Sequence, residues 1–142
     1  MAPPAKFEAG TQPVAQGGAA GAAAEWMMAI GMDAIAAHEH EVAAELLRLG
    51  DVDGVRILGP RENRDRIGTV AFDVDGVHPH DVGQFIDAQG IAIRVGHHCA
   101  QPVHRHFGLY ASNRASSGVY NSVADAQALV EAVSKVRAFF RV

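Results

Sequence analysis

The alternation of apolar and polar residues predicts four strands. Thr69 to Val74 places an apolar residue at every second position, which is typical of a half-buried strand. Val55-Arg56-Ile57-Leu58 is expected to form a short strand that ends at a Gly-Pro turn signal. Ile91 to Val95 alternates large apolar residues with a small one and a charge, and Ala111 to Ala115 is expected to return as the fourth strand.

Helical spacing of apolar residues predicts helices around these strands. Gly21 to Ile30 has a composition that favours helix, whereas Met1 to Ala24 as a whole has the Ala-, Gly- and Pro-rich composition of a flexible leader. A longer helix is expected after Asp33, its cap, with Gly50 just past its end. Its polar residues are expected to form a solvated face; these are His38, Glu39, His40, Glu41 and Glu45.

Two more helices have recognisable starts. Pro79 suits the first turn of a helix closed by Gly90, so the histidines on either side of Pro79 are interpreted as part of a helix start, with acid–base work as the alternative. Ser122 is expected to cap the last helix with Asp125 three residues later. One face of this helix is apolar and should pack on a sheet; it comprises Ala126, Leu129, Val130, Val133, Val136 and Phe140.

The order of these elements indicates an α+β fold in which helices pack on a mostly antiparallel small sheet. The chain has 142 residues, of which 49% are hydrophobic and 20% charged, so it can form one soluble domain with a core. A formal charge of -4 without a basic block argues against a nucleic acid partner. No stretch is long enough to span a membrane, and a single cysteine fits a reducing cytoplasm.

Candidate chemistry concentrates in the segment from Arg94 to Pro102, which holds the only cysteine. Gly96 lets the chain turn after the third strand, so Cys99 is expected in a loop. A thiol acts as a nucleophile only as thiolate, and Arg94, His97 and His98 could supply the positive or hydrogen-bonding groups that this needs. An inert buried thiol is the plainer interpretation.

The histidines near Cys99 raise two further interpretations. Zinc needs ligands that converge tetrahedrally, and the sequence has no C-x-x-C pair and no clear helical H-x-x-x-H, so we expect no metal site. The residues after Pro102 are interpreted as an exposed basic rim; they are His104, Arg105 and His106.

The run R-x-G-H-H-C-A-Q-P, followed by Arg114-Ala115-Ser116 and Tyr120-Asn121, resembles the C-terminal part of a SufS-type (group II) cysteine desulfurase of the class V aminotransferase superfamily. Further stretches resemble that family in the same order. They are Phe7-Glu8-Ala9-Gly10-Thr11, Ile30-Gly31-Met32, His38-Glu39, Gly76-Val77-His78-Pro79-His80-Asp81-Val82 and Phe139-Phe140.

The resemblance implies a division of the chain. Residues 1–30 would be the linker or tail of a large domain that binds pyridoxal phosphate and is absent from this sequence. Residues 31–142 would be the small C-terminal domain of a fold-type I pyridoxal-phosphate transferase and would carry the cysteine loop. The resemblance also implies a homodimer, in which Gly10 and Thr11 reach the cofactor phosphate of the partner subunit; Gln12 interrupts this loop.

The activity implied is removal of sulfur from L-cysteine, which leaves L-alanine and a persulfide on Cys99 for an acceptor protein of iron–sulfur cluster assembly. Arg114 matches the arginine that binds the substrate carboxylate, where a two-donor fork fits well. Arg94 matches a second active-site arginine.

The departures from the family concern the cofactor. A Schiff-base enzyme needs a lysine, and neither Lys6 nor Lys135 matches the family's lysine. Ser117-Gly118 also replaces a bulkier apolar pair. We therefore expect a C-terminal fragment that is inactive without the large domain. Two alternatives stay open: a stand-alone sulfur-relay or interaction module, and a structural remnant without sulfur chemistry.

Overall fold

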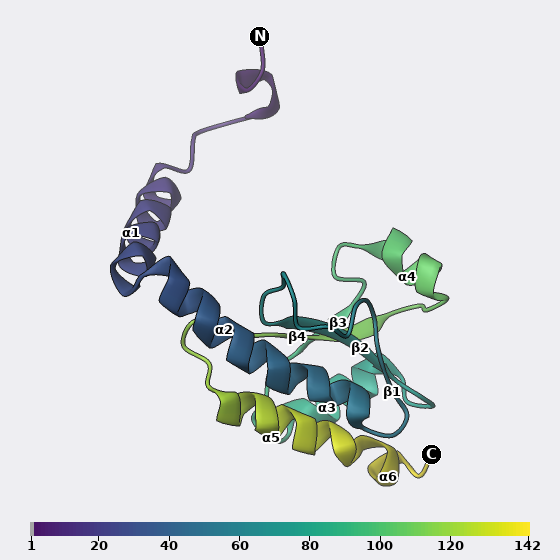
Figure 1. Cartoon of the computed structure of the whole chain (residues 1–142). Helices are drawn as coiled ribbons and strands as arrows, with labels where there is room; N and C mark the ends of the chain where they lie inside the picture. Colours follow the sequence, from purple (N-terminus) through teal and green to yellow (C-terminus); the bar gives the residue numbers. More distant parts are fainter. Residues whose placement is uncertain (1) are drawn as a thin grey trace. The chain divides into compact units, whose positions relative to one another are not determined.

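A computed structural model describes residues 2–142, and the chain forms two compact units, Met1–Ile35 and Ala36–Val142 (Figure 1). The second unit contains a four-stranded sheet in the order β1-β2-β4-β3, in which every neighbouring pair is antiparallel. The predicted α+β fold with a small antiparallel sheet is thus confirmed. The strands are β1 (Val55–Ile57), β2 (Thr69–Val74), β3 (Arg94–Gly96) and β4 (Ser112–Ser116).

The strand β2 has the predicted bounds and the predicted alternation, because each second side chain is buried. The strand β3 was predicted over residues 91–95 but pairs with β4 only from Arg94 to Gly96. The residues before it do not join the ladder; Ile91 and Ile93 instead pack, partly buried, against the core. An added Cβ at Gly83 would lie 2.5 Å from Val95 Cγ2, so glycine at this position permits the close approach of a neighbouring helix to β3.

The sheet has two unlike faces, because side chains of paired residues lie on the same side and alternate along each strand. We call one the core face; it carries Val70, Phe72 and Ala115. We call the other the reactive face. The pairing places the following residues on the reactive face: Arg56, Asp73, Arg94, Ser112 and Arg114.

Helices cover the core face (Figure 1). They are α2 (Met32–Leu47), α3 (Pro79–Asp87), α5 (Val123–Ser134) and α6 (Val136–Phe140). Their fully buried side chains include Val42, Val82, Ile86, Val133 and Val136. The single last helix predicted from the apolar pattern is two helices, which meet at Lys135.

Side-chain caps begin α3 and α5, as predicted. His78 precedes α3 and its ring accepts a hydrogen bond from the backbone N–H of His80 at 3.3 Å. Ser122 and Asp125 form a reciprocal capping box that satisfies two N–H groups at the start of α5. The prediction for Asp33 was wrong in position: it lies in the first turn of α2, where a carboxylate favours the positive end of the helix dipole.

The polar face of α2 is not uniformly solvated. His38 is half-buried, and its Nε2 lies 2.7 Å from the carbonyl oxygen of Asn121. Glu45 keeps only 13% of its side chain exposed, where it pairs with Arg48 at 2.8 Å. The expectation of a solvated face was therefore wrong for these two residues; His38 contacts the segment before α5, and Glu45 pairs with a residue of the next turn of the chain.

The first unit contains a short 3-10 helix, η1 (Ala5–Phe7), and α1 (Val14–Ile30). The helix predicted from Gly21 thus begins at Val14, and the flexible-leader interpretation was wrong from that residue onward. Alanine has the highest helix propensity, and it outweighs the glycines in this stretch. None of the helices in residues 2–142 combines the length and the apolar character needed to cross a bilayer.

The sequence pattern missed one helix, α4 (Gln101–Phe107), which follows directly after the cysteine. Pro102 lies in its first turn, and Gly108 ends it in the left-handed conformation with φ 71°. Arg56 on the reactive face donates a hydrogen bond to the carbonyl oxygen of Phe107 at 3.3 Å. The C-terminal end of α4 therefore lies on the reactive face.

Candidate active site

Cys99 lies in a tight turn between β3 and α4, as the loop prediction required, and its side chain is exposed. We call His97–Ala100 the Cys loop. The turn is closed by a hydrogen bond of 2.8 Å from the N–H of Ala100 to the carbonyl oxygen of His97. Both residues between them are left-handed, with φ 54° at His98 and φ 59° at Cys99. This conformation costs about 1–2 kcal/mol for each non-glycine residue, so other contacts must hold the turn.

One of these contacts joins Cys99 to the end of β3. The guanidinium of Arg94 donates a hydrogen bond from Nη2 to Cys99 Sγ at 3.4 Å. Cys99 Sγ is therefore exposed and lies beside a permanent cation, which is the setting in which reactive cysteines are found. The inert buried thiol is therefore excluded as a description of this cysteine.

A second arginine lies beside the first. Arg94 and Arg114 are directly paired across β3 and β4, so both side chains leave the sheet on the reactive face. Like charges directly opposite each other destabilise a sheet unless an anion lies between or near them. Arg114 is half-buried, and its Nε is buried without a hydrogen-bond partner among the described residues. This arrangement suits a carboxylate, which a guanidinium can bind through two parallel hydrogen bonds.

Behind the Cys loop lies a buried group of two histidines and a serine. Ser112 Oγ lies 3.0 Å from His98 Nε2 and 2.9 Å from His104 Nε2. His104 Nδ1 in turn lies 3.1 Å from the carbonyl oxygen of Ala100. Ser112 is fully buried and His104 is only 3% exposed. The prediction that His104 belongs to an exposed basic rim was wrong, because α4 turns this residue toward the sheet, while Arg105 and His106 are exposed.

The charges around His98 favour its neutral form. Burial lowers the pKa of His98 below its ordinary value, and the positive charge of Arg114 acts in the same direction, followed by His104 and Arg94. A neutral imidazole has one N–H and one free acceptor nitrogen. His98 Nδ1 is buried and has no hydrogen-bond partner among the described residues.

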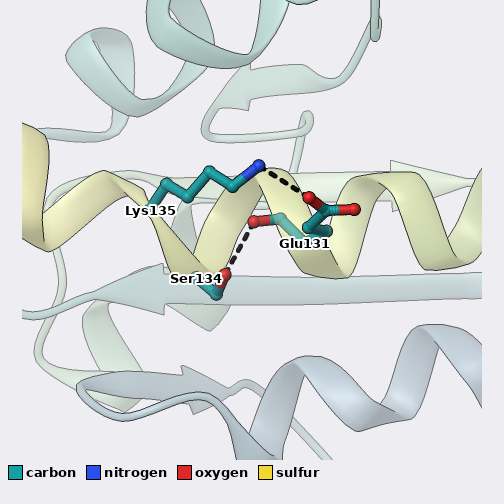
Figure 2. Close-up of polar contacts among 3 residues, drawn as sticks. All are labelled: Glu131, Ser134 and Lys135. Atoms are coloured by element: carbon teal, nitrogen blue, oxygen red, sulfur yellow. Dashed lines mark hydrogen bonds and ion pairs between the residues drawn. The ribbon is translucent and has the colours of Figure 1, made fainter.

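A Schiff base requires a lysine amine, and the unit Ala36–Val142 contains one lysine, Lys135. Figure 2 shows this side chain at the end of α5, where its Nζ lies 2.7 Å from Glu131 Oε1. This hydrogen bond lowers the pKa of Glu131. Because α5 packs on the core face, Lys135 and the Cys loop lie on opposite sides of the sheet. The residues of this unit therefore do not fit the Schiff-base role that pyridoxal phosphate requires.

Gly10 and Thr11 form an exposed bend in the first unit, before α1, and Gln12 there donates a hydrogen bond to Glu8 at 3.1 Å. Their predicted contact with a cofactor phosphate stays a prediction. Across residues 2–142, His, Cys, Asp and Glu side chains form no group of three or more that could hold a metal ion.

Sequence reasoning missed Ser112 and the buried position of His104. A serine between an alanine and an asparagine carries no signal of a buried role. For His104 a signal was present, because Pro102 near a helix start and Gly108 at a helix end together indicate a short helix. Such a helix would have placed Ala100 and His104 one turn apart.

Comparison with known proteins gives one family. The family model described as aminotransferase class-V matches residues 1–129. A probable cysteine desulfurase 2 from Mycobacterium leprae is 51% identical over 138 residues, and a probable cysteine desulfurase from Streptomyces coelicolor is 49% identical. Each alignment covers 96% of this chain and 33% of the relative, so the chain spans about a third of the length of these relatives.

Solved structures give the same result. The apo structure of a cysteine desulfurase from Thermococcus onnurineus NA1 matches with a TM-score of 0.79 and 37% identity, over 95% of this chain and 34% of that one. The cysteine desulfurase CsdA from Escherichia coli matches with a TM-score of 0.80 and 31% identity, over 98% of this chain and 34% of that one.

Proposed function

The chain belongs to the aminotransferase class-V family, and on this premise we propose that it forms the cysteine-bearing part of a SufS-type cysteine desulfurase. Its activity would be the transfer of sulfur from L-cysteine to Cys99. The relatives named cysteine desulfurase support the reaction class. The observation that carries the assignment of residues is the contact of 3.4 Å between Arg94 Nη2 and Cys99 Sγ.

In this proposal Cys99 acts as the nucleophile. Its thiolate attacks the sulfur of L-cysteine, a sulfur–sulfur bond forms, and the bond between that sulfur and the β-carbon breaks. The carbon keeps the electron pair and takes the proton that the substrate thiol has lost. The products are L-alanine and a Cys99 persulfide, so atoms and charge balance: the transferred sulfur is oxidised and the carbon is reduced.

The two arginines have different roles in this proposal. Arg114 binds the substrate carboxylate, which supplies the anion that the cross-strand pair with Arg94 lacks. Arg94 holds the sulfur of Cys99 at the same face of the sheet. The carboxylate and the reacting sulfur of the substrate would then be held within one small region, which orients the substrate for attack.

The wider assignment follows the family resemblance. When bound, pyridoxal phosphate would act as the electron sink of the reaction. Because Lys135 does not fit, we infer that the Schiff-base amine comes from residues outside Ala36–Val142, in a large domain to which residues 1–30 would lead. Gly10 and Thr11 would reach the cofactor phosphate of a partner subunit in a homodimer. An iron–sulfur cluster assembly protein in the cytoplasm would accept the sulfur.

The test is sulfide release from L-cysteine and pyridoxal phosphate in the presence of a thiol reductant, with and without a separately expressed polypeptide that carries the family's lysine. We expect release only in the complete mixture, and, when the reductant is left out, a mass gain of one sulfur atom on Cys99. Cys99→Ser should abolish both signals, whereas Ser134→Ala, which changes an exposed hydroxyl on α5, should leave both unchanged. Release that persists in Cys99→Ser would refute the assignment of the nucleophile.

One observation favours a second candidate function. The exposed Cys99 and the neighbouring Arg94 belong to the same unit, and this unit has no lysine suited to a Schiff base. This arrangement suits a sulfur-relay module, in which Cys99 accepts a persulfide sulfur from another protein. Incubation with a persulfide donor and no large domain would then give the same mass gain. A gain under these conditions, with no sulfide release in the complete mixture, would favour the relay over the desulfurase.

A further inference from the structure

We propose that Ser112 and His104 are positioning residues, which hold His98 through a directional chain of hydrogen bonds and thereby keep Cys99 beside Arg94. This inference rests on the proposed function, because it gives Cys99 the role of nucleophile. It concerns hydrogen bonds that this polypeptide makes without any group of the substrate or cofactor.

The direction of the hydrogen-bond chain is set at its buried end, at His104. The carbonyl oxygen of Ala100 can only accept, so His104 Nδ1, at 3.1 Å, carries the proton and donates. A neutral His104 then has a free lone pair on Nε2, and this nitrogen accepts from the hydroxyl of Ser112 at 2.9 Å. The single proton of Ser112 is thereby used.

The remaining contact must run the other way. Ser112 Oγ has lone pairs left, so it accepts from His98 Nε2 at 3.0 Å, and His98 is the tautomer protonated on Nε2. This tautomer leaves His98 Nδ1 without a proton, which agrees with the absence of a protein partner for that nitrogen among the described residues. Each proton in the chain thus has one acceptor.

A second proton on either ring would break this order. With a doubly protonated His104, the hydroxyl of Ser112 would receive two donors and its own proton would have no acceptor in a fully buried place. A doubly protonated His98 would add a positive charge to the face that already carries Arg94 and Arg114. The neutral, directional arrangement is the one that satisfies every buried hydroxyl and ring N–H.

The hydrogen-bond chain connects the strained turn of the Cys loop to the sheet. Ser112 lies on β4, directly opposite Gly96, and His98 and Cys99 are the two left-handed residues of the Cys loop. His104 connects the same serine to Ala100, on the other side of the turn. The turn is therefore held from both ends by one side chain of β4. Loss of that side chain should let the turn relax and carry Cys99 away from Arg94.

The first experiment reads the tautomer of His98 in the full 142-residue chain by side-chain nitrogen NMR at pH 8. We expect a neutral ring protonated on Nε2 in the wild type and a mixture of tautomers in Ser112→Ala. His106→Ala, which removes an exposed histidine of α4, should leave the His98 signals unchanged. A wild-type His98 protonated on Nδ1 would overturn the inference.

The second experiment measures the rate at which iodoacetamide alkylates Cys99. We expect Ser112→Ala and His98→Ala to lower the rate roughly tenfold, and His98→Gln to restore it to within about threefold of wild type. The side-chain amide of glutamine can take the place of Nε2–H and donate to Ser112, so rescue identifies the hydrogen bond and not the ring. Equal rates in His98→Ala and wild type would overturn the inference, even if Ser112→Ala failed to fold.

Neither experiment needs a large domain, so the two proposals can fail separately. The expected tautomer and alkylation rates together with no sulfide release in the complete mixture would support the positioning role and refute the desulfurase. Sulfide release that depends on Cys99 but is the same in His98→Ala and wild type would overturn the positioning role alone.

Discussion

The two faces of the sheet contribute differently to the stability of the fold, although they are built from alternate residues of the same strands. On the core face, Val70, Phe72 and Ala115 are buried against helices, and their packing stabilises the fold. On the reactive face, two arginines lie opposite each other and the adjoining turn contains two left-handed residues. Stability thus comes from one face, while the other holds groups that oppose it. Truncation of a core-face side chain and removal of one of the paired arginines should therefore differ in sign as well as in size.

The largest expected effect is a cavity on the core face. Phe72 is completely buried at the centre of β2, so Phe72→Ala should lower the free energy of unfolding by about 3–5 kcal/mol. Urea titration followed by circular dichroism measures this change. Tyr120→Ala, at a residue that is 86% exposed, is the control and should change it by less than about 0.5 kcal/mol. A loss below about 1 kcal/mol for Phe72→Ala would contradict the assignment of the core face.

A smaller loss is expected where a helix of the core face begins. Ser122→Ala removes one half of the capping box of α5 and should cost about 1 kcal/mol. The same titration measures it. Ser134→Ala at the other end of α5 provides the matched control, because its hydroxyl bonds a carbonyl of its own helix. Equal effects of the two substitutions would show that the capping box adds nothing.

On the reactive face we expect a change of the opposite sign. Arg94→Gln removes the repulsion between paired arginines and should raise the free energy of unfolding by about 0.2–1 kcal/mol at low salt. The gain should shrink as salt screens the charges, and the alkylation rate of Cys99 should fall. Arg64→Gln, on an exposed loop, is the control for the loss of one positive charge. A loss of stability in Arg94→Gln would show that its contacts outweigh the repulsion.

The smallest effect is a pH dependence on the reactive face. Burial raises the pKa of Asp73 above its ordinary value of 3.8; Arg56 opposes this shift and Asp75 adds to it. The folded chain therefore keeps this proton to a higher pH than the unfolded chain, so stability falls as the pH rises from 3.8 through the folded-state pKa. Asp73→Asn should remove this part of the slope, which urea titrations between pH 3.5 and 7 can measure. Parallel stability curves for the two proteins would refute it.

The two faces differ in how well the sequence predicts them, because their interactions join residues at different separations along the chain. The alternation in β2, the cap at Ser122 and the loop position of Cys99 depend on neighbours within a few residues, and they were predicted. The positions of the apolar residues on the helices follow the same local periodicity. A sequence read alone therefore describes most of the core face.

The reactive face depends on contacts between residues far apart in the chain. The pairing of Arg94 with Arg114 depends on the register of β3 against β4, which no local pattern sets. Ser112 gains its role only because that register brings it under His98 and because α4 returns His104 to the same hydroxyl. The resemblance to a family pointed to the arginines and the cysteine, but not to the residues that hold them.

The left-handed turn at His98 and Cys99 has a consequence for how mutations would be tolerated. Glycine adopts this conformation without steric cost, so selection for thermostability alone would favour glycine at both positions. Each such gain would remove either the thiol or the ring that holds it. A library sorted for folding and the same library sorted for sulfur transfer should therefore diverge most sharply at these two adjacent codons, and the sequence of a surviving clone would reveal which of the two properties had been selected.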